Sequence, residues 1–325
     1  MINILITSAS RKVSLVKAFQ QALAGEGGGR VMAVDVSPLA PALYCADEHY
    51  LVPPDHKPEF LAIMLRLCQQ KGVKLLIPTR DEELPFFAGH KGEFADVGTL
   101  VMVSDADVVK TCQDKKLFLR FCRENGFAIP QSYESMKLPA NVEFPVFVKP
   151  RYGKGGRHAV RVNSREGLET VLKEMPDAII QGFVPAPEYT IDLFADFSGR
   201  VISVVPRERL NIVGGESFIS RTSNNPGLIR EAIRLATRLG VIGHINIQCF
   251  LDKDMVRFIE VNPRFGGASH LSFAAGAPTP LFLVKLVKRE SLEPQIGEFK
   301  DNYIMLRYTE DLFLEEDSLA ARTVL

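Results

Sequence analysis

A glutamate, an asparagine and an arginine occur two residues apart in the segment FIEVNPRFGGASH, as Glu260, Asn262 and Arg264. Pro263 disfavours a helix for the residue before it, so this segment is predicted to be a strand that runs into a loop. Alternate side chains of a strand share a face, which would bring two oxygen ligands and a guanidinium to one spot. Such a set suits Mg²⁺ and phosphate oxygens. An edge strand with a surface ion pair is the alternative.

The segment just before it, GHINIQCFLDKDM, predicts a partner strand in a hairpin. An odd-length turn around Lys253 keeps the even-numbered positions of both strands on the same face. Gln248 is therefore expected beside Glu260 and Asn262, as a third oxygen donor.

A glycine-rich loop between two predicted strands supplies positive charge in FVKPRYGKGGRHAVRV. Glycines let backbone N–H groups approach phosphate oxygens, and basic side chains neutralise phosphate charge. A P-loop is excluded, because it needs G-x-x-x-x-G-K-[ST] at the start of a helix. A basic hairpin turn is the alternative. The residues concerned are Lys149 at the strand end, Gly153, Gly155 and Gly156 in the loop, and the bases Arg151, Lys154 and Arg157.

The first third of the chain alternates predicted strands with predicted helices, which is typical of an α/β layer with a parallel sheet. Ser10 is expected to cap the first helix. The first strand-to-helix turn, T-S-A-S-R-K, lacks G-x-G-x-x-G, so a dinucleotide site is not expected. A domain boundary is predicted near residue 110. The expected strands cover residues 2–7, 30–36, 73–79 and 100–104, and the expected helices residues 11–24 and 58–72.

Beyond that boundary the spacing changes to strands in hairpins with helices set between them, which favours an α+β arrangement. A single helix is expected within residues 105–130, with Leu117, Phe118, Phe121 and Cys122 on one side. The further expected strands cover residues 144–150, 158–163, 178–184, 188–196, 201–210, 244–251 and 255–261, and the further helices residues 164–175 and 226–240.

The composition is that of an ordinary globular protein, with 46% hydrophobic residues and equal numbers of basic and acidic residues, 39 each. This balance favours neither a nucleic acid partner nor an anionic membrane surface. No stretch approaches the roughly 20 apolar residues that span a bilayer, so a cytoplasmic protein is expected. The five cysteines include no C-x-x-C pair, which is typical of reduced, mostly buried thiols.

Taken in order, these motifs resemble the ATP-grasp superfamily, in its short carbamoyl-phosphate-synthase-like branch. The resemblance implies a Rossmann-like pre-ATP-grasp domain over residues 1–110 and an ATP-grasp domain over residues 111–325. The latter would comprise a lid at about 111–185 and a carboxy-terminal subdomain at about 186–325. The loop departs from the family's common G-S-G-S-R-G, because it reads G-K-G-G-R-H here.

The resemblance also implies roles for individual residues. Lys115, in a DKxxF helix, and Lys149 would contact the nucleotide phosphates, with Gly153, Gly155 and Gly156 around them. Gln181, Gly182, Phe183 and Val184 would form the adenine hinge, and Glu188 would bind the ribose. Glu260, Asn262 and the nearby Gln248 would hold the metal, while Arg264 would hold the transferring phosphate and act with Lys149 in catalysis.

The implied reaction is carboxylate–amine ligation through an acyl phosphate, with ATP and Mg²⁺ or Mn²⁺ as cofactors. Two alternatives stay open: phosphorylation of bicarbonate, as in carbamoyl phosphate synthase, and a nucleotide-binding protein without catalysis. The expected partners are a small carboxylate and an amine, with no nucleic acid and no membrane, and a homodimer is left open. Candidate substrate contacts are Arg207, Arg209 and Glu216 in PRERLNIVGGES, Ser10 and Arg11 at the first helix, and Asp81 in TRDEEL.

Overall fold

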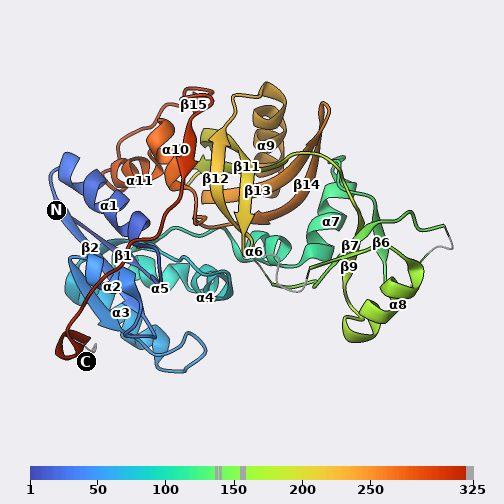
Figure 1. Ribbon diagram of the computed structural model, residues 1–325. Helices are drawn as coiled ribbons and strands as arrows, with labels where there is room; N and C mark the ends of the chain where they lie inside the picture. Colours follow the sequence, from blue (N-terminus) through green and yellow to red (C-terminus); the bar gives the residue numbers. More distant parts are fainter. Residues whose placement is uncertain (136–137, 139–140, 154–158, 320–325) are drawn as a thin grey trace.

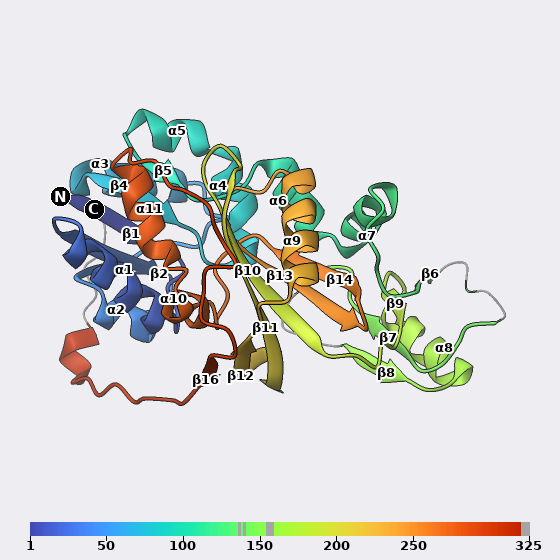
Figure 2. The same ribbon diagram turned by 90° about the horizontal axis from the view of Figure 1, so that it is seen from above.

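The computed structural model describes residues 1–135, 138, 141–153 and 159–319. Three sheets follow one another along the molecule, with the largest sheet in the middle (Figures 1 and 2). The mixture of α/β and α+β parts agrees with the fold class expected from the sequence.

The amino-terminal part is built on a five-stranded sheet of order β3-β2-β1-β4-β5, in which every pairing is parallel. The parallel α/β layer is thus confirmed. Its central strands are buried on both faces, which explains their continuous apolar runs. Sequence reasoning missed β3 and the short helices α2, α4 and α5. The elements are β1 Ile2–Ile6, α1 Val13–Gly25, β2 Gly29–Asp35, α2 Pro41–Cys45, β3 Glu48–Leu51, α3 Phe60–Lys71, β4 Val73–Ile77, η1 Asp81–Glu83, α4 Leu84–Gly89, α5 Lys91–Asp96 and β5 Leu100–Val101.

The expected cap of the first helix is wrong. Helix α1 begins at Val13, its N-cap position is Lys12, and no side chain caps it. Ser10 lies two residues earlier with φ 46°, and its backbone N–H donates to Asp35 Oδ2 at 2.9 Å. This turn therefore ties the end of β1 to the end of β2 instead of starting the helix.

The next part carries a small antiparallel sheet of order β6-β9-β7-β8, covered by one helix and packed around its own core. The single helix expected within residues 105–130 is in fact two helices, because Asp114 ends α6 and caps α7 through Lys116 and Leu117. The elements are α6 Ala106–Gln113, α7 Lys115–Glu124, β6 Ser132–Glu134, β7 Val146–Lys149, β8 Val160–Val162, α8 Arg165–Glu174 and β9 Ile179–Gly182.

The last part is a seven-stranded, mostly antiparallel sheet of order β14-β13-β10-β11-β12-β16, with β15 beside β11. Helix α9 packs on one face, against the odd-numbered apolar residues of β10 and β13. The even-numbered residues of these strands, largely polar, face the other way. The elements are β10 Glu188–Ala195, β11 Val201–Val213, β12 Glu216–Thr222, α9 Pro226–Leu239, β13 Gly243–Asp252, β14 Met255–Asn262, α10 His270–Ala275, α11 Thr279–Val287, β15 Gln295–Ile296, β16 Ile304–Leu306 and η2 Glu316–Leu319.

One hydrophobic core contains side chains from both the amino-terminal part and the part that follows β14. The rings of Phe19 in α1 and Phe265 beyond β14 meet edge to face, with centroids 6.0 Å apart, and Phe282 of α11 belongs to the same cluster. The domain limits at residues 110 and 185 remain predictions.

Within the described residues, no helix has the length and apolar character needed to cross a membrane. All five cysteines are free thiols and four of them are buried, as expected.

Candidate active site

The hairpin of β13 and β14 sets the orientation of the candidate metal ligands. Gln248 pairs with Glu260 and Asn246 pairs with Asn262, which agrees with the register expected around Lys253. Between these pairs and the next one, Cys249 with Phe258, the register shifts by one residue. Such a β-bulge re-aims side chains, so Phe258 enters the core below α9 while Glu260 emerges on the opposite face.

Glu260 and Asn262 lie side by side at the end of β14, with the amide nitrogen of Asn262 toward the carboxylate and its amide oxygen toward Arg264. Asn262 Nδ2 donates to Glu260 Oε1 at 3.3 Å. In the amide orientation that satisfies both of its neighbours, Gln248 donates to Glu260 Oε1 at 3.1 Å and accepts from Arg209 Nη1 at 3.1 Å. The oxygen of Gln248 therefore faces Arg209, and the amide would have to turn before it could serve as a metal ligand.

Arg264 forms a two-pronged ion pair with Asp81, which lies 183 residues away in the sequence. Arg264 Nε donates to Asp81 Oδ1 at 2.7 Å and Nη2 donates to Oδ2 at 2.6 Å. The same Nη2 lies 3.3 Å from Asn262 Oδ1, so the guanidinium adjoins the candidate metal ligands. The structure thus brings together Arg264, which was predicted to hold the transferring phosphate, and Asp81, which was predicted to contact a substrate.

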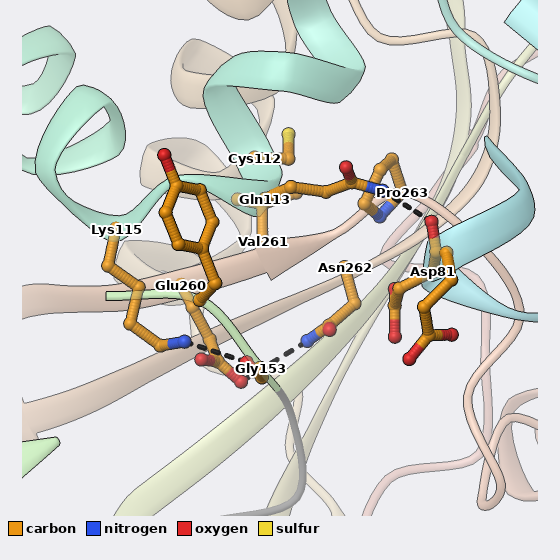
Figure 3. A pocket seen from close by; sticks show the side chains of 11 residues that line it. Asp81, Cys112, Gln113, Lys115, Gly153, Glu260, Val261, Asn262 and Pro263 are labelled. Carbon is orange, nitrogen blue, oxygen red and sulfur yellow. Dashed lines mark hydrogen bonds between the residues drawn. The ribbon is translucent and has the colours of Figure 1, made fainter. Parts of the chain in front are cut away.

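A pocket opens between these groups and the glycine-rich segment (Figure 3). Lys115, the first residue of α7, extends its side chain into the pocket and donates from Nζ to the Gly153 carbonyl oxygen at 2.7 Å. The Glu260 carboxylate points toward the same place, and Asp81 lies on the far side of Asn262 (Figure 3). Positive and negative groups from all three parts of the chain therefore line one pocket. Gly155 and Gly156 lie outside the described residues.

Lys149 and Glu188 form a second group of charges close to this pocket. Burial lowers the pKa of Lys149 to about 8, and Lys115 adds to this effect while Glu260 and Glu188 oppose it. Burial raises the pKa of the Glu188 carboxyl, although Arg209 Nη1 donates to Glu188 Oε1 at 2.8 Å. Lys149 is thus a cation that a bound anion would stabilise in its charged form.

Affinity for a phosphate-bearing ligand is expected to fall as the pH rises above 8. Free Lys149 loses its proton there, whereas a phosphate beside it requires the ammonium, so the dissociation constant should rise by up to about tenfold per pH unit. Calorimetric titration between pH 7 and 9.5 measures this slope. The Lys149→Arg variant keeps its charge over this range and should show a flatter profile. Equal slopes in the two proteins would contradict the role of Lys149.

The predicted adenine hinge comprises the last two residues of β9, an inner strand of the small sheet, and the two residues after it. Gln181 is buried, and its Nε2 donates to Ser132 Oγ at 3.1 Å. The Gly182 N–H donates to the Gln131 carbonyl oxygen at 2.7 Å, and the Phe183 N–H donates to the Pro145 carbonyl oxygen at 3.1 Å. The phenyl ring of Phe183 is partly exposed and stacks on Phe147, which leaves an apolar surface beside Val184.

The other predicted substrate contacts lie outside the pocket of Figure 3. Arg207 is buried and pairs with Asp192 at 2.8 Å, and Arg209 pairs with Glu188. Glu216 accepts a hydrogen bond from Arg307. Ser10 belongs to the turn between β1 and α1, and its neighbour Arg11 is exposed.

Sequence reasoning missed the role of Asp114 in this region. Its carboxylate contacts Arg151 and Tyr152, so it joins the start of α7 to the segment before the glycine-rich loop. Aspartate is a preferred N-cap residue, but the helix prediction rested on apolar residues that all follow Asp114 and so did not mark where the helix begins.

The donor set is compatible with a hard cation. Carboxylate and amide oxygens of Glu260 and Asn262 are the ligands that Mg²⁺ accepts, and this ion keeps several positions for water and phosphate. Among the described residues there is no group of three or more His, Cys, Asp and Glu side chains that could hold a metal ion by themselves.

Comparisons with known proteins give family matches for two parts of the chain. Residues 4–102 match the family described as PylC-like, N-terminal domain, and residues 174–310 match the family described as ATP-grasp in the biosynthetic pathway with Ter operon. The carbamoyl phosphate synthase large chain of Gemmatimonas aurantiaca is 29% identical over 218 residues, which cover 60% of this chain and 20% of that protein.

Two solved structures share the fold at low sequence identity. The L-amino acid ligase of Bacillus licheniformis superposes with a TM-score of 0.72 at 19% identity, over 93% of this chain and 78% of that one. The biotin carboxylase domain of Hydrogenobacter thermophilus 2-oxoglutarate carboxylase, solved with MgADP, ADP and bicarbonate, gives 0.71 at 16% identity, over 94% and 73%.

The resemblance to the ATP-grasp superfamily is thus confirmed: residues 174–310 match an ATP-grasp family, residues 4–102 match a PylC-like amino-terminal domain, and the curated relatives are carbamoyl phosphate synthase large chains. The chain spans about a fifth of the length of the curated relatives that it matches.

Proposed function

We propose that this protein is an ATP- and Mg²⁺-dependent ligase that converts a carboxylate into an acyl phosphate, which an amine then attacks with release of ADP and phosphate. The observation that carries the proposal is the convergence of Glu260, Asn262, Lys115 and the Asp81–Arg264 pair around one pocket. Phosphoryl transfer depends mainly on positioning and charge neutralisation, which these groups can supply.

The acceptor of the phosphoryl group is a substrate carboxylate in this proposal, and not the Cys112 thiol of the pocket. Cys112 lines the pocket, but burial raises the pKa of its thiol well above the ordinary range, so the thiolate is scarce at neutral pH. The described lining residues include no serine or histidine. A substrate carboxylate is the acceptor that relatives of the ligase type suggest.

The proposed roles follow from charge and position. Glu260 and Asn262 would hold Mg²⁺, joined by Gln248 after its amide turns, and the ion would supply positive charge to the phosphate oxygens. Lys115 and Lys149 would neutralise phosphate charge, and Arg264 would hold the transferring phosphate. Glu188 would meet the ribose, and the segment from Gln181 to Val184 would meet the adenine.

Phosphorylation of bicarbonate is the second candidate. It is favoured by the curated relatives, which are carbamoyl phosphate synthase large chains, and by the bicarbonate in the Hydrogenobacter structure. The likeness to an L-amino acid ligase favours the carboxylate–amine reaction instead.

Hydroxylamine trapping is expected to detect the acyl phosphate. Small carboxylates are screened with ATP and Mg²⁺, and hydroxylamine should convert the activated acid into a hydroxamate, because it replaces the amine. Omission of ATP or of the carboxylate should abolish the product. Turnover that depends on bicarbonate and yields no hydroxamate would favour the second candidate. Binding of ATP without ADP release under every mixture would favour a protein without catalysis.

A further inference from the structure

The carboxylate of Asp114 does more than cap a helix. It is 5% exposed, lies between α6 and α7, and accepts hydrogen bonds on Oδ1 from Lys116 N at 2.9 Å and from Leu117 N at 3.4 Å. These two bonds satisfy the first turn of α7, as an N-cap residue does. An uncharged asparagine could make both of them.

The negative charge of Asp114 is directed to the segment that follows β7. Arg151 Nε donates to Oδ1 at 2.8 Å and Nη2 donates to Oδ2 at 2.5 Å, while Tyr152 Oη donates to Oδ2 at 3.1 Å. A bidentate arginine–carboxylate pair fixes both distance and orientation. The cap of α7 and residues 151–152 are therefore held by one carboxylate.

Lys115 completes the connection between the two segments. Its backbone N–H donates to the Arg151 carbonyl oxygen at 3.2 Å, and its Nζ donates to the Gly153 carbonyl oxygen. Lys115, Tyr152 and Gly153 all line the pocket of Figure 3. The groups that Asp114 holds are thus the ones that face the proposed phosphate site.

We propose that Asp114 is a positioning residue for nucleotide binding, which holds Lys115 and the 151–153 segment in the arrangement that receives the phosphates. This inference rests on the proposed function, because it assigns the pocket to ATP. Asp114 itself does not line the pocket, so its effect passes through Arg151, Tyr152 and Lys115.

The substitution Asp114→Asn separates positioning from capping. The amide retains an oxygen for the N–H groups of α7, but it removes the anion that pairs with Arg151. Arg151→Met removes the same pair from the other side. Asp177→Asn is the matched control, because Asp177 accepts from Arg151 Nη1 at 3.1 Å but is 57% exposed and lies away from the pocket.

The test measures the dissociation constant of a non-hydrolysable ATP analogue with Mg²⁺, by calorimetry on the full chain, together with the melting temperature. We expect Asp114→Asn and Arg151→Met each to weaken binding by about tenfold or more, which is the size of effect for a charge-assisted pair. The double variant should bind no more weakly than the single variants, since both remove one interaction. Asp177→Asn should remain within about twofold, since exposed ion pairs contribute little.

Two results would overturn the inference: Asp114→Asn binding as tightly as the unmodified chain, or fully additive losses in the double variant. Loss of melting temperature with unchanged affinity would show a structural role only. If Asp114→Asn fails to fold, Arg151→Met decides the question, because Arg151 caps no helix. An unmodified chain that binds no nucleotide would instead contradict the proposed function.

Discussion

Replacement of Glu260 by glutamine is expected to lower metal-dependent ATP turnover by about 10³-fold or more, because it removes the one carboxylate among the proposed metal ligands. Glutamine has nearly the same shape and still offers an oxygen to Asn262 Nδ2 and to Gln248. The fold should therefore survive. ADP release at increasing Mg²⁺ concentration, measured beside the melting temperature, separates the loss of metal binding from unfolding.

Two further variants sharpen this result. Asn262→Ala should produce a smaller loss, of about 10²-fold, since it removes a neutral ligand. Glu208→Gln is the control, because Glu208 lies on β11 and pairs with Arg221 outside the pocket. Unchanged Mg²⁺ dependence in both Glu260→Gln and Asn262→Ala would contradict the assignment of the metal site.

The second large effect is expected at Arg264, where Arg264→Met should lower kcat by about 10²–10³-fold by removing the charge proposed to hold the transferring phosphate. Asp81→Asn should be milder, because it leaves the guanidinium in place and free to bind phosphate. Both side chains are mostly buried, so each single variant should also lower the melting temperature. ADP release and thermal unfolding measure the two effects separately.

The double variant Arg264→Met with Asp81→Asn distinguishes a catalytic arginine from a structural one. Removing both charges should restore part of the stability, because neither partner is then left unpaired. The double variant should not regain turnover if Arg264 binds the transferring phosphate. Recovery of turnover together with stability would show that Arg264 acts only through its pair with Asp81.

The pairing of β13 with β14 could be predicted because the turn around Lys253 and the alternation of polar residues indicate the same register. The bulge at Ile259 could not, since nothing in VRFIEVN distinguishes it from a regular strand. Only the packing of Phe258 below α9 explains why this residue and Glu260 face opposite ways. Local alternation thus predicted which of these side chains are cross-strand neighbours, while the core decided their orientation.

Contacts between residues far apart in the sequence could not be predicted from local motifs. The partner of Arg264 is Asp81, the first residue of η1 in the amino-terminal part, and no local pattern connects them. Arg207 was a candidate substrate contact because its segment resembles the one that faces substrate in relatives, yet its guanidinium pairs with the buried Asp192 carboxylate. The strand pattern of the amino-terminal part was predictable, because parallel strands buried on both faces are continuously apolar.

The small sheet β6–β9 and helix α8 keep a modest apolar core of their own. A unit with so few buried apolar side chains can open locally at a lower free energy than the rest of the molecule. A nucleotide held in the proposed way, between this unit and the large sheet, would add its binding free energy to the closed form. The cellular lifetime of the chain would then depend on the ATP supply, because proteases attack the locally opened form that the nucleotide suppresses. The members of that core are Val142, Val146, Val148, Val162, Leu168, Ala178 and Ile180.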